Sequence, residues 1–177
     1  MSTAVAPRLW TEPEYLAFER GSEVEHELLD GEILTTLNNA FGDERCEAHG
    51  SDMKVRVPDG AGTLITYPDV SALCGEPELL DDSRDVLLNP QVIFEVLSKS
   101  SESYDRGEKF RRYRLIPSLQ DYLLVSQKEA FVEHDTRQAD ATWNLRELGR
   151  GDPIRLPVLD CELALDDVYR RLLPAAD

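Results

Sequence analysis

The stretch Val92–Leu97, which reads VIFEVL, is the most apolar run of the sequence, and a glutamate, Glu95, stands inside it. A short run of this kind predicts a central strand of a sheet that is buried on both faces. Burying a carboxylate without a partner is costly, so we expect Glu95 to contact a cation, a hydrogen-bond donor or a metal ion. The fold and the chemistry of the chain are therefore both expected to centre on this strand.

The length and composition of the chain predict one folded domain. Its 177 residues are enough to bury a core. Apolar runs such as Val92–Leu97 and Tyr122–Val125 argue against disorder, although 31% of the residues are charged. We expect residues 1–8 to be a flexible N-terminus, residues 9–173 to form a single domain, and residues 174–177 to be a C-terminal tail.

The net charge is −16, from 35 acidic and 19 basic residues. A field of this sign repels polyanions, which argues against a general affinity for nucleic acids. The segment Asp105–Arg114 differs from the rest, because five basic side chains stand there against two acidic ones. A nuclease is not excluded, since the local charge decides at a cleft.

The cysteines, Cys46, Cys74 and Cys161, are odd in number and widely spaced, and they include no CxxC pair. We therefore expect neither a disulfide framework nor a zinc site, and we interpret Cys74 as a buried thiol. The start, Met1–Arg8, has no apolar run, and no stretch of about 18 apolar residues occurs. The sequence predicts a soluble, cytoplasmic protein with no membrane partner.

The residues before the apolar strand predict a short helix and a β-hairpin. Thr11–Glu14 has the capping-box pattern of a helix start. Val24–Leu29 and Glu32–Leu34 flank Asp30-Gly31, which predicts a hairpin with a type I′ turn.

Two further segments predict strands between this hairpin and the apolar strand. Met53–Val57 alternates with period two and is typical of a half-buried strand. Leu64–Tyr67 and Val70–Leu73 flank Pro68-Asp69, which predicts an edge strand or a strand interrupted at the proline.

Strands outnumber helices in the second half of the chain as well. After the Ser-rich stretch Ser98–Ser103 we expect a helix from about Tyr104 to Leu115, stopped before Pro117. The remaining expected elements are strands at Tyr122–Val125, Ala130–His134 and Thr142–Leu148, and a closing amphipathic helix at Leu165–Leu173.

Asp69, after Pro68, and Glu95 could form a carboxylate pair suited to a hard divalent cation such as Mg²⁺. Such an ion activates a water and neutralises charge on a phosphodiester. Asp105, Lys109 and Tyr113 follow at i, i+4 and i+8, on one helical face. If this face packs on the apolar strand, the Lys109 ammonium can orient a nucleophilic water or stabilise developing negative charge.

Each of these residues also has a purely structural interpretation. Glu95 can be the partner of an arginine, and Asp69 can be an ordinary turn residue after proline. Asp105 and Lys109 can be a common helix ion pair. The order of a Pro-Asp turn, a strand glutamate and a helix lysine is much less often accidental than any one of them.

These motifs resemble the Uma-type restriction-endonuclease-like family, within the PD-(D/E)xK nuclease superfamily. The resemblance extends from about Leu9 to Leu173, and its most specific part is the pair of strings EVLS and DRGEK. The segments that carry it are Pro68-Asp69-Val70, Phe94–Ser101, Tyr104–Lys109 and Tyr113, with His26–Glu32 similar to the opening hairpin of the family and Pro117–Val125 to its later helix-to-strand junction.

The resemblance implies an α/β, or α+β, fold with a restriction-endonuclease-like mixed β-sheet flanked by helices and an N-terminal β-hairpin. It implies that Asp69 and Glu95 are metal ligands and that Glu27 completes the shell of the ion. The superfamily lysine normally stands two residues after the strand acid, where this sequence has Leu97. Lys109 would be its migrated replacement.

The resemblance further implies that Asp105 and Tyr113 hold Lys109 in place. Members of the family usually carry, after the opening hairpin, a loop with a histidine and a full amphipathic helix. Here the segment Leu34–Thr36 is followed at once by Leu37–Phe41, so the loop and the full helix are missing from the sequence. Either they have been lost, which would expose part of the core, or a mobile loop beside the site is absent from the printed sequence.

Two functional hypotheses remain. The first is a nuclease that depends on Mg²⁺ or Mn²⁺ and acts on DNA, with Asp69 and Glu95 as ligands, the Val96 carbonyl assisting them and Lys109 serving the water or the transition state. The second is a catalytically inactive protein of the same fold that acts as an interaction or oligomerisation module. A homodimer is expected in both cases, because exposed edges of small sheets are often covered by a partner.

Overall fold

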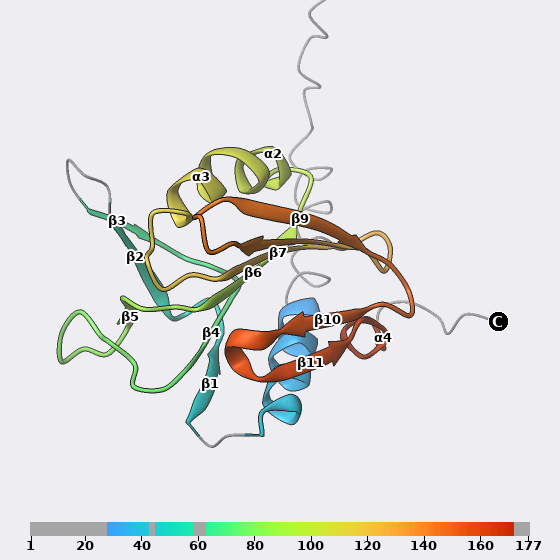
Figure 1. Ribbon diagram of the computed structural model, residues 1–177, viewed down its shortest axis with the longest axis horizontal. Helices are drawn as coiled ribbons and strands as arrows, with labels where there is room; N and C mark the ends of the chain where they lie inside the picture. Colours follow the sequence, from blue (N-terminus) through green and yellow to red (C-terminus); the bar gives the residue numbers. More distant parts are fainter. Residues whose placement is uncertain (1–27, 43–44, 59–62, 172–177) are drawn as a thin grey trace, which may run out of the picture.

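A computed structural model describes residues 28–42, 45–58 and 63–171. The largest sheet in this part of the chain is mixed and has six strands (Figure 1). One neighbouring pair in its centre is parallel and the others are antiparallel. The strands are, in spatial order, β1 (Cys46–His49), β4 (Val70–Cys74), β6 (Val92–Leu97), β7 (Asp121–Ser126), β8 (Val132–Arg137) and β9 (Trp143–Leu148), with β6 and β7 as the parallel pair.

β6 lies inside the sheet and is buried at all six positions, as predicted for a central strand. Its side chains alternate between the two faces of the sheet. Phe94 and Val96 pack into one hydrophobic core, while Ile93 and Leu97 pack into a second core on the opposite face. Glu95 shares the face of this second core, and only 2% of its surface is exposed.

A helical segment covers the face that carries Glu95. It consists of α2 (Glu102–Tyr104), the π-helical turn η1 (Asp105–Lys109) and α3 (Phe110–Tyr113), which follow one another directly. The Phe110 ring stacks on the Tyr122 ring of β7, with 4.7 Å between the ring centroids. The helix predicted after the Ser-rich stretch is confirmed, and its middle has the π-helical geometry that is frequent at functional sites.

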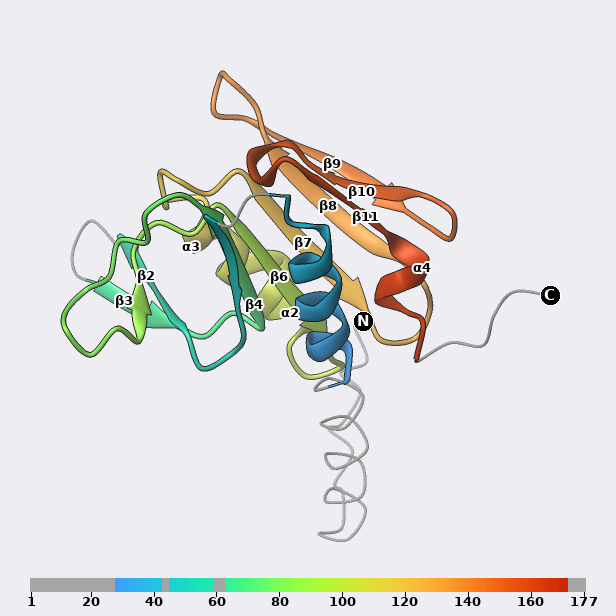
Figure 2. The same ribbon diagram turned by 90° about the horizontal axis from the view of Figure 1, so that it is seen from below.

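The opposite face of the sheet is covered by a helix over residues 28–40 and by the C-terminal elements (Figure 2). The C-terminal elements are β10 (Pro153–Leu156), the 3-10 turn η2 (Pro157–Leu159), β11 (Cys161–Ala164) and α4 (Leu165–Val168). β10 and β11 pair as an antiparallel hairpin that the sequence did not predict.

A smaller sheet flanks the large one and contains β3 (Thr63–Thr66), β2 (Lys54–Pro58) and β5 (Val86–Leu87), in this order. β2 confirms the predicted half-buried strand, and β3 is an edge strand. The chain leaves this sheet after β3, passes through Pro68, and enters β4 of the large sheet at Val70. The proline therefore marks the junction between the two sheets.

The predicted N-terminal β-hairpin is wrong within the described residues, because residues 28–40 are helical. Leu29, Ile33 and Leu37 recur every four residues and are fully buried against the large sheet. The burial of this helical stripe outweighs the turn signal of Asp30-Gly31.

The same helix runs through Thr36 and Leu37 without a break, so no loop separates them. The helix predicted to begin at Thr11–Glu14 lies outside the described residues, as do the first residues of the predicted hairpin, Val24–Glu27.

The prediction that the cysteines form no disulfide, with Cys74 a buried thiol, is also wrong. Cys46 of β1 and Cys74 of β4 form a disulfide. The sequence separates them by 28 residues, but the antiparallel register places them directly opposite each other. Cys161 is the free cysteine in the described part of the chain.

The closing helix is shorter than the predicted Leu165–Leu173. α4 ends at Val168, and the buried Tyr169 hydroxyl donates a hydrogen bond to the Ser126 carbonyl oxygen at 2.6 Å, which ties the chain to the end of β7. None of the helices in the described part of the chain is long and apolar enough to span a membrane.

We predict that Gly31→Ala stabilises the protein by about 0.5–1 kcal/mol, the usual advantage of alanine over glycine inside a helix. Gly31 is helical, and an added Cβ would meet no atom within 4 Å. In a type I′ turn the same position needs a positive φ, where alanine destabilises. Urea denaturation measures the difference, and a lower free energy of unfolding in the variant would favour the hairpin.

Candidate active site

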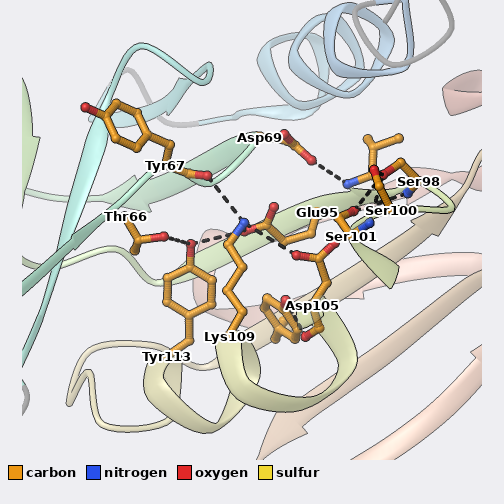
Figure 3. A network of polar contacts seen from close by, with 12 residues as sticks. Thr66, Tyr67, Asp69, Glu95, Ser98, Ser100, Ser101, Asp105, Lys109 and Tyr113 are labelled. Atoms are coloured by element: carbon orange, nitrogen blue, oxygen red, sulfur yellow. Dashed lines mark hydrogen bonds and ion pairs between the residues drawn. The ribbon is translucent and has the colours of Figure 1, made fainter. Parts of the chain in front are cut away.

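The junction between the two sheets places Asp69 beside the central strand. Asp69 Oδ2 accepts a hydrogen bond of 2.7 Å from the backbone N–H of Val96. In the antiparallel register of β4 and β6, Val70 stands opposite Phe94. Asp69, which directly precedes β4, therefore lies next to Glu95. The structure therefore brings together the two acids that the sequence predicted (Figure 3). Val96 contacts Asp69 through its N–H, and the expected assistance of its carbonyl to a metal ion stays a prediction.

Lys109 reaches this pair from the helical segment. Its Nζ lies 2.7 Å from Glu95 Oε1 and 3.6 Å from Asp105 Oδ1. It also donates to the backbone carbonyl oxygen of Tyr67 at 3.4 Å. The predicted packing of this helical face on the apolar strand is thus found, and Lys109 points toward Glu95 in Figure 3.

Tyr113 contacts Glu95 directly. Its hydroxyl donates to Glu95 Oε1 at 3.0 Å, and it shares a hydrogen bond of 3.3 Å with the Thr66 hydroxyl. The Tyr113 ring also lies 5.9 Å from Lys109 Nζ, within the range of a cation–π contact. Asp105 and Tyr113 were both predicted to hold Lys109. The distance of 3.6 Å between Lys109 Nζ and Asp105 Oδ1 fits this role, and Tyr113 contacts Glu95 as well as Lys109.

Two contacts were missed by the sequence reasoning. Thr66 enters through its bond to Tyr113, and the buried Tyr122 hydroxyl donates to the Asp105 carbonyl oxygen at 3.1 Å. Thr66 could have been found from its inward position in the alternating strand before Pro68, but Tyr122 carries no comparable local signal. Glu27, the third predicted ligand, lies outside the described residues.

The electrostatics of the pair follow from its burial. Burial raises the pKa of the Glu95 carboxyl well above its ordinary value; the Lys109 ammonium opposes this, and the charge of Asp69 adds to it. Burial also disfavours charge on Lys109, but the attraction of Glu95 and Asp105 outweighs it and raises the pKa of the ammonium. Lys109 is therefore a charged group held against a carboxyl whose ionisation is opposed by burial and favoured by the ammonium.

The basic residues of the helical segment do not form an uncompensated positive patch. Arg106 pairs with Glu133 of β8. Arg111 and Arg112 both pair with Glu108 of their own helical segment, at 2.9 Å and 2.7 Å. Most of the positive charges that the sequence places in this segment are therefore paired with acidic side chains of the protein itself.

The donors at the site fit Mg²⁺ or Mn²⁺. Mg²⁺ keeps several of its waters and is commonly held by one or two carboxylates, as Asp69 and Glu95 could provide. Among the residues that the structure describes, the donors to Glu95 are Lys109 and Tyr113, which both approach Oε1 and do not occupy Oε2. Within residues 28–42, 45–58 and 63–171, no three His, Cys, Asp or Glu side chains are grouped closely enough to hold a metal ion by themselves. The site therefore suits a partly hydrated ion.

The sequence matches the Uma2 family, described as "Putative restriction endonuclease", over residues 16–167. Two uncharacterized proteins of Synechocystis sp. (strain ATCC 27184 / PCC 6803 / Kazusa) are similar to this chain. The protein sll1609 is 33% identical over 165 residues, covering 84% of this chain and 92% of its own length. The protein slr1290 is 34% identical over 188 residues, covering 96% of each.

The alignment with slr1290 is longer than the 177 residues of this chain, so slr1290 has residues without a counterpart here. A solved structure of a putative nuclease belonging to DUF820 from Anabaena variabilis ATCC 29413 is similar in fold. The TM-score is 0.64 at 16% identity, covering 84% of this chain and 82% of that one.

We predict that the metal-free protein loses stability, relative to a Glu95→Gln variant, as the pH rises above about 4.3, the ordinary glutamate pKa. The folded-state pKa of Glu95 is raised, so its contribution to stability is present below the unfolded-state value and is lost as the pH rises through the folded-state value. Urea denaturation in EDTA at several pH values measures both proteins, and parallel profiles would contradict the prediction.

Proposed function

The chain belongs to the Uma2 ("Putative restriction endonuclease") family, and we propose that it is a nuclease that uses Mg²⁺ or Mn²⁺ to hydrolyse phosphodiester bonds of DNA. The observation that carries the proposal is the contact of 2.7 Å between Lys109 Nζ and Glu95 Oε1, beside Asp69. A cation and two acids in such proximity at a buried strand are the groups that metal-assisted phosphodiester hydrolysis needs.

Asp69 and Glu95 would hold the ion. When bound, Mg²⁺ or Mn²⁺ supplies Lewis acidity, which favours ionisation of a bound water and neutralises charge on the phosphodiester. The Val96 N–H fixes the Asp69 carboxylate, and the Tyr113 hydroxyl fixes that of Glu95, so both ligands are positioned in advance.

Lys109 has the position of the group that acts on the nucleophile or on the transition state. An ammonium has three hydrogen-bond donors. Its side chain is 13% exposed, compared with 2% for Glu95, so it is the more accessible member of the pair. There it can orient a nucleophilic water or stabilise the negative charge that develops on a phosphoryl oxygen.

The net charge of −16 favours a second function, in which the same fold acts as an inactive interaction or dimerisation module. Long-range repulsion between this protein and a polyanion slows association and weakens binding. The two functions differ in one property, which is turnover that depends on Glu95 and Lys109.

We predict that the purified protein cleaves DNA, supplied both as plasmid and as a single-stranded oligonucleotide, with Mg²⁺ or Mn²⁺ and not in EDTA. Glu95→Ala and Lys109→Ala should lower the rate by about 10²-fold or more, the usual effect of removing a charge-stabilising group. Glu162→Gln is the matched control, because it removes an exposed acid whose ion-pair partner among the described residues is Arg155.

Circular dichroism of each variant establishes that it is folded. Equal cleavage by the wild type and both site variants would identify a contaminant and end the catalytic proposal. No cleavage by any of them, with an intact fold, would favour the interaction module.

A further inference from the structure

The outer face of the small sheet exposes an aromatic side chain at the edge of the candidate site. The side chains of β3 alternate, so that Leu64 packs into the second core and Thr66 bonds to Tyr113. The residues between and after them turn outward, and Ile65 is 37% and Tyr67 58% exposed. A tyrosine exposed to this extent can present part of its ring to a ligand.

Basic side chains lie on the same outer face. Arg56 of β2 stands directly opposite Ile65 in the antiparallel register, and Lys54 is two residues from it on the same face. Lys54 pairs with Asp85 at 2.6 Å, so its charge is compensated. Arg56 makes no ion pair within the part of the chain that the structure describes. We call Arg56, Ile65 and Tyr67 the β2–β3 face.

The β2–β3 face is continuous with the site. The carbonyl oxygen of Tyr67 accepts the hydrogen bond from Lys109, and Asp69 follows two residues later in the chain. In Figure 3 the Tyr67 ring points away from Glu95 and Lys109 while its carbonyl points toward them. A base stacked on the ring would therefore belong to a strand that passes the cation that Asp69 and Glu95 would hold.

We propose that the β2–β3 face binds an unpaired strand of DNA, with a base stacked on Tyr67 and a phosphate contacted by Arg56. The proposal rests on the proposed nuclease function and names its substrate. Base stacking on an aromatic ring requires an unstacked base, which a single strand offers and an intact duplex does not.

The net charge of the protein also favours a single strand over a duplex as the ligand. Duplex binding depends mainly on many contacts between phosphates and basic side chains. A chain of net charge −16, whose helical arginines are paired internally, offers few such contacts. A single strand is also a polyanion, but its charge density is lower than that of a duplex, so its binding depends less on basic side chains and more on stacking.

The test is the affinity for a fluorescent single-stranded DNA oligonucleotide, measured by anisotropy in EDTA, where metal-dependent cleavage cannot occur. A duplex of the same sequence and a single-stranded RNA of the same sequence are the competing ligands. Tyr67→Ala removes the ring and Tyr67→Phe keeps it. Tyr104→Ala is the matched control, because Tyr104 is a comparably exposed tyrosine, at 47%.

We expect Tyr67→Ala to weaken single-strand binding by about tenfold, as for the loss of one stacked base. Tyr67→Phe and Tyr104→Ala should stay within about twofold of the wild type, and the single-stranded DNA should bind more tightly than the duplex. Unchanged binding in Tyr67→Ala, a preference for the duplex, or tighter binding of the RNA would overturn the proposal.

Sedimentation of the same variants separates binding from assembly. If Tyr67→Ala converts a dimer to a monomer, the β2–β3 face is covered by a second copy of the chain and the proposal fails. If single strands bind through Tyr67 but no nucleic acid is cleaved, only the nuclease function fails. If cleavage depends on Glu95 but Tyr67→Ala leaves the affinity for single strands unchanged, only the present inference fails.

Discussion

The buried ion pair between Glu95 and Lys109 is the interaction on which the arrangement of this protein depends. A carboxylate that is 2% exposed on a central strand is unfavourable unless charged and hydrogen-bonding groups surround it. The helical segment supplies Lys109 and Tyr113, and its π-helical turn ends at the lysine. Replacing a buried ion pair by apolar side chains is often neutral or stabilising, so an energetically demanding pair of this kind favours a functional role over a structural one.

The junction of the two sheets adds the second acid to this pair. Because β3 and β4 belong to different sheets, the chain between them turns at Pro68 and presents Asp69 to the backbone of β6. The same turn directs the Tyr67 carbonyl toward Lys109. One short connection thus positions a candidate metal ligand, a hydrogen-bond acceptor for the cation and an exposed aromatic ring.

The sequence predicted which residues of the candidate site lie together better than it predicted the secondary structure around them. Glu95, Lys109 and Asp69 stand in segments whose local patterns are strong: an apolar run, a helical spacing and a proline turn. The helix over residues 28–40 was mistaken for a hairpin because Asp30-Gly31 is a strong turn signal. Its burial against the sheet, which decides the outcome, is a long-range contact.

Other features depend on pairings that no local pattern records. The disulfide between Cys46 and Cys74 exists because β1 and β4 are neighbours in register. The hairpin of β10 and β11 is formed by two strands of four residues each, which are short for a local pattern to identify, and it is stabilised by packing on the large sheet. The hydrogen bond between Thr66 and Tyr113 joins residues from different layers of the fold.

Diffraction from crystals soaked in Mn²⁺, recorded near the manganese absorption edge, tests the central claim most directly. We expect an anomalous peak in contact with both the Asp69 and the Glu95 carboxylates and absent from crystals of Glu95→Gln. A strong peak elsewhere, or none at these two acids at saturating Mn²⁺, would mean that the buried pair is structural and that no metal-dependent chemistry takes place there.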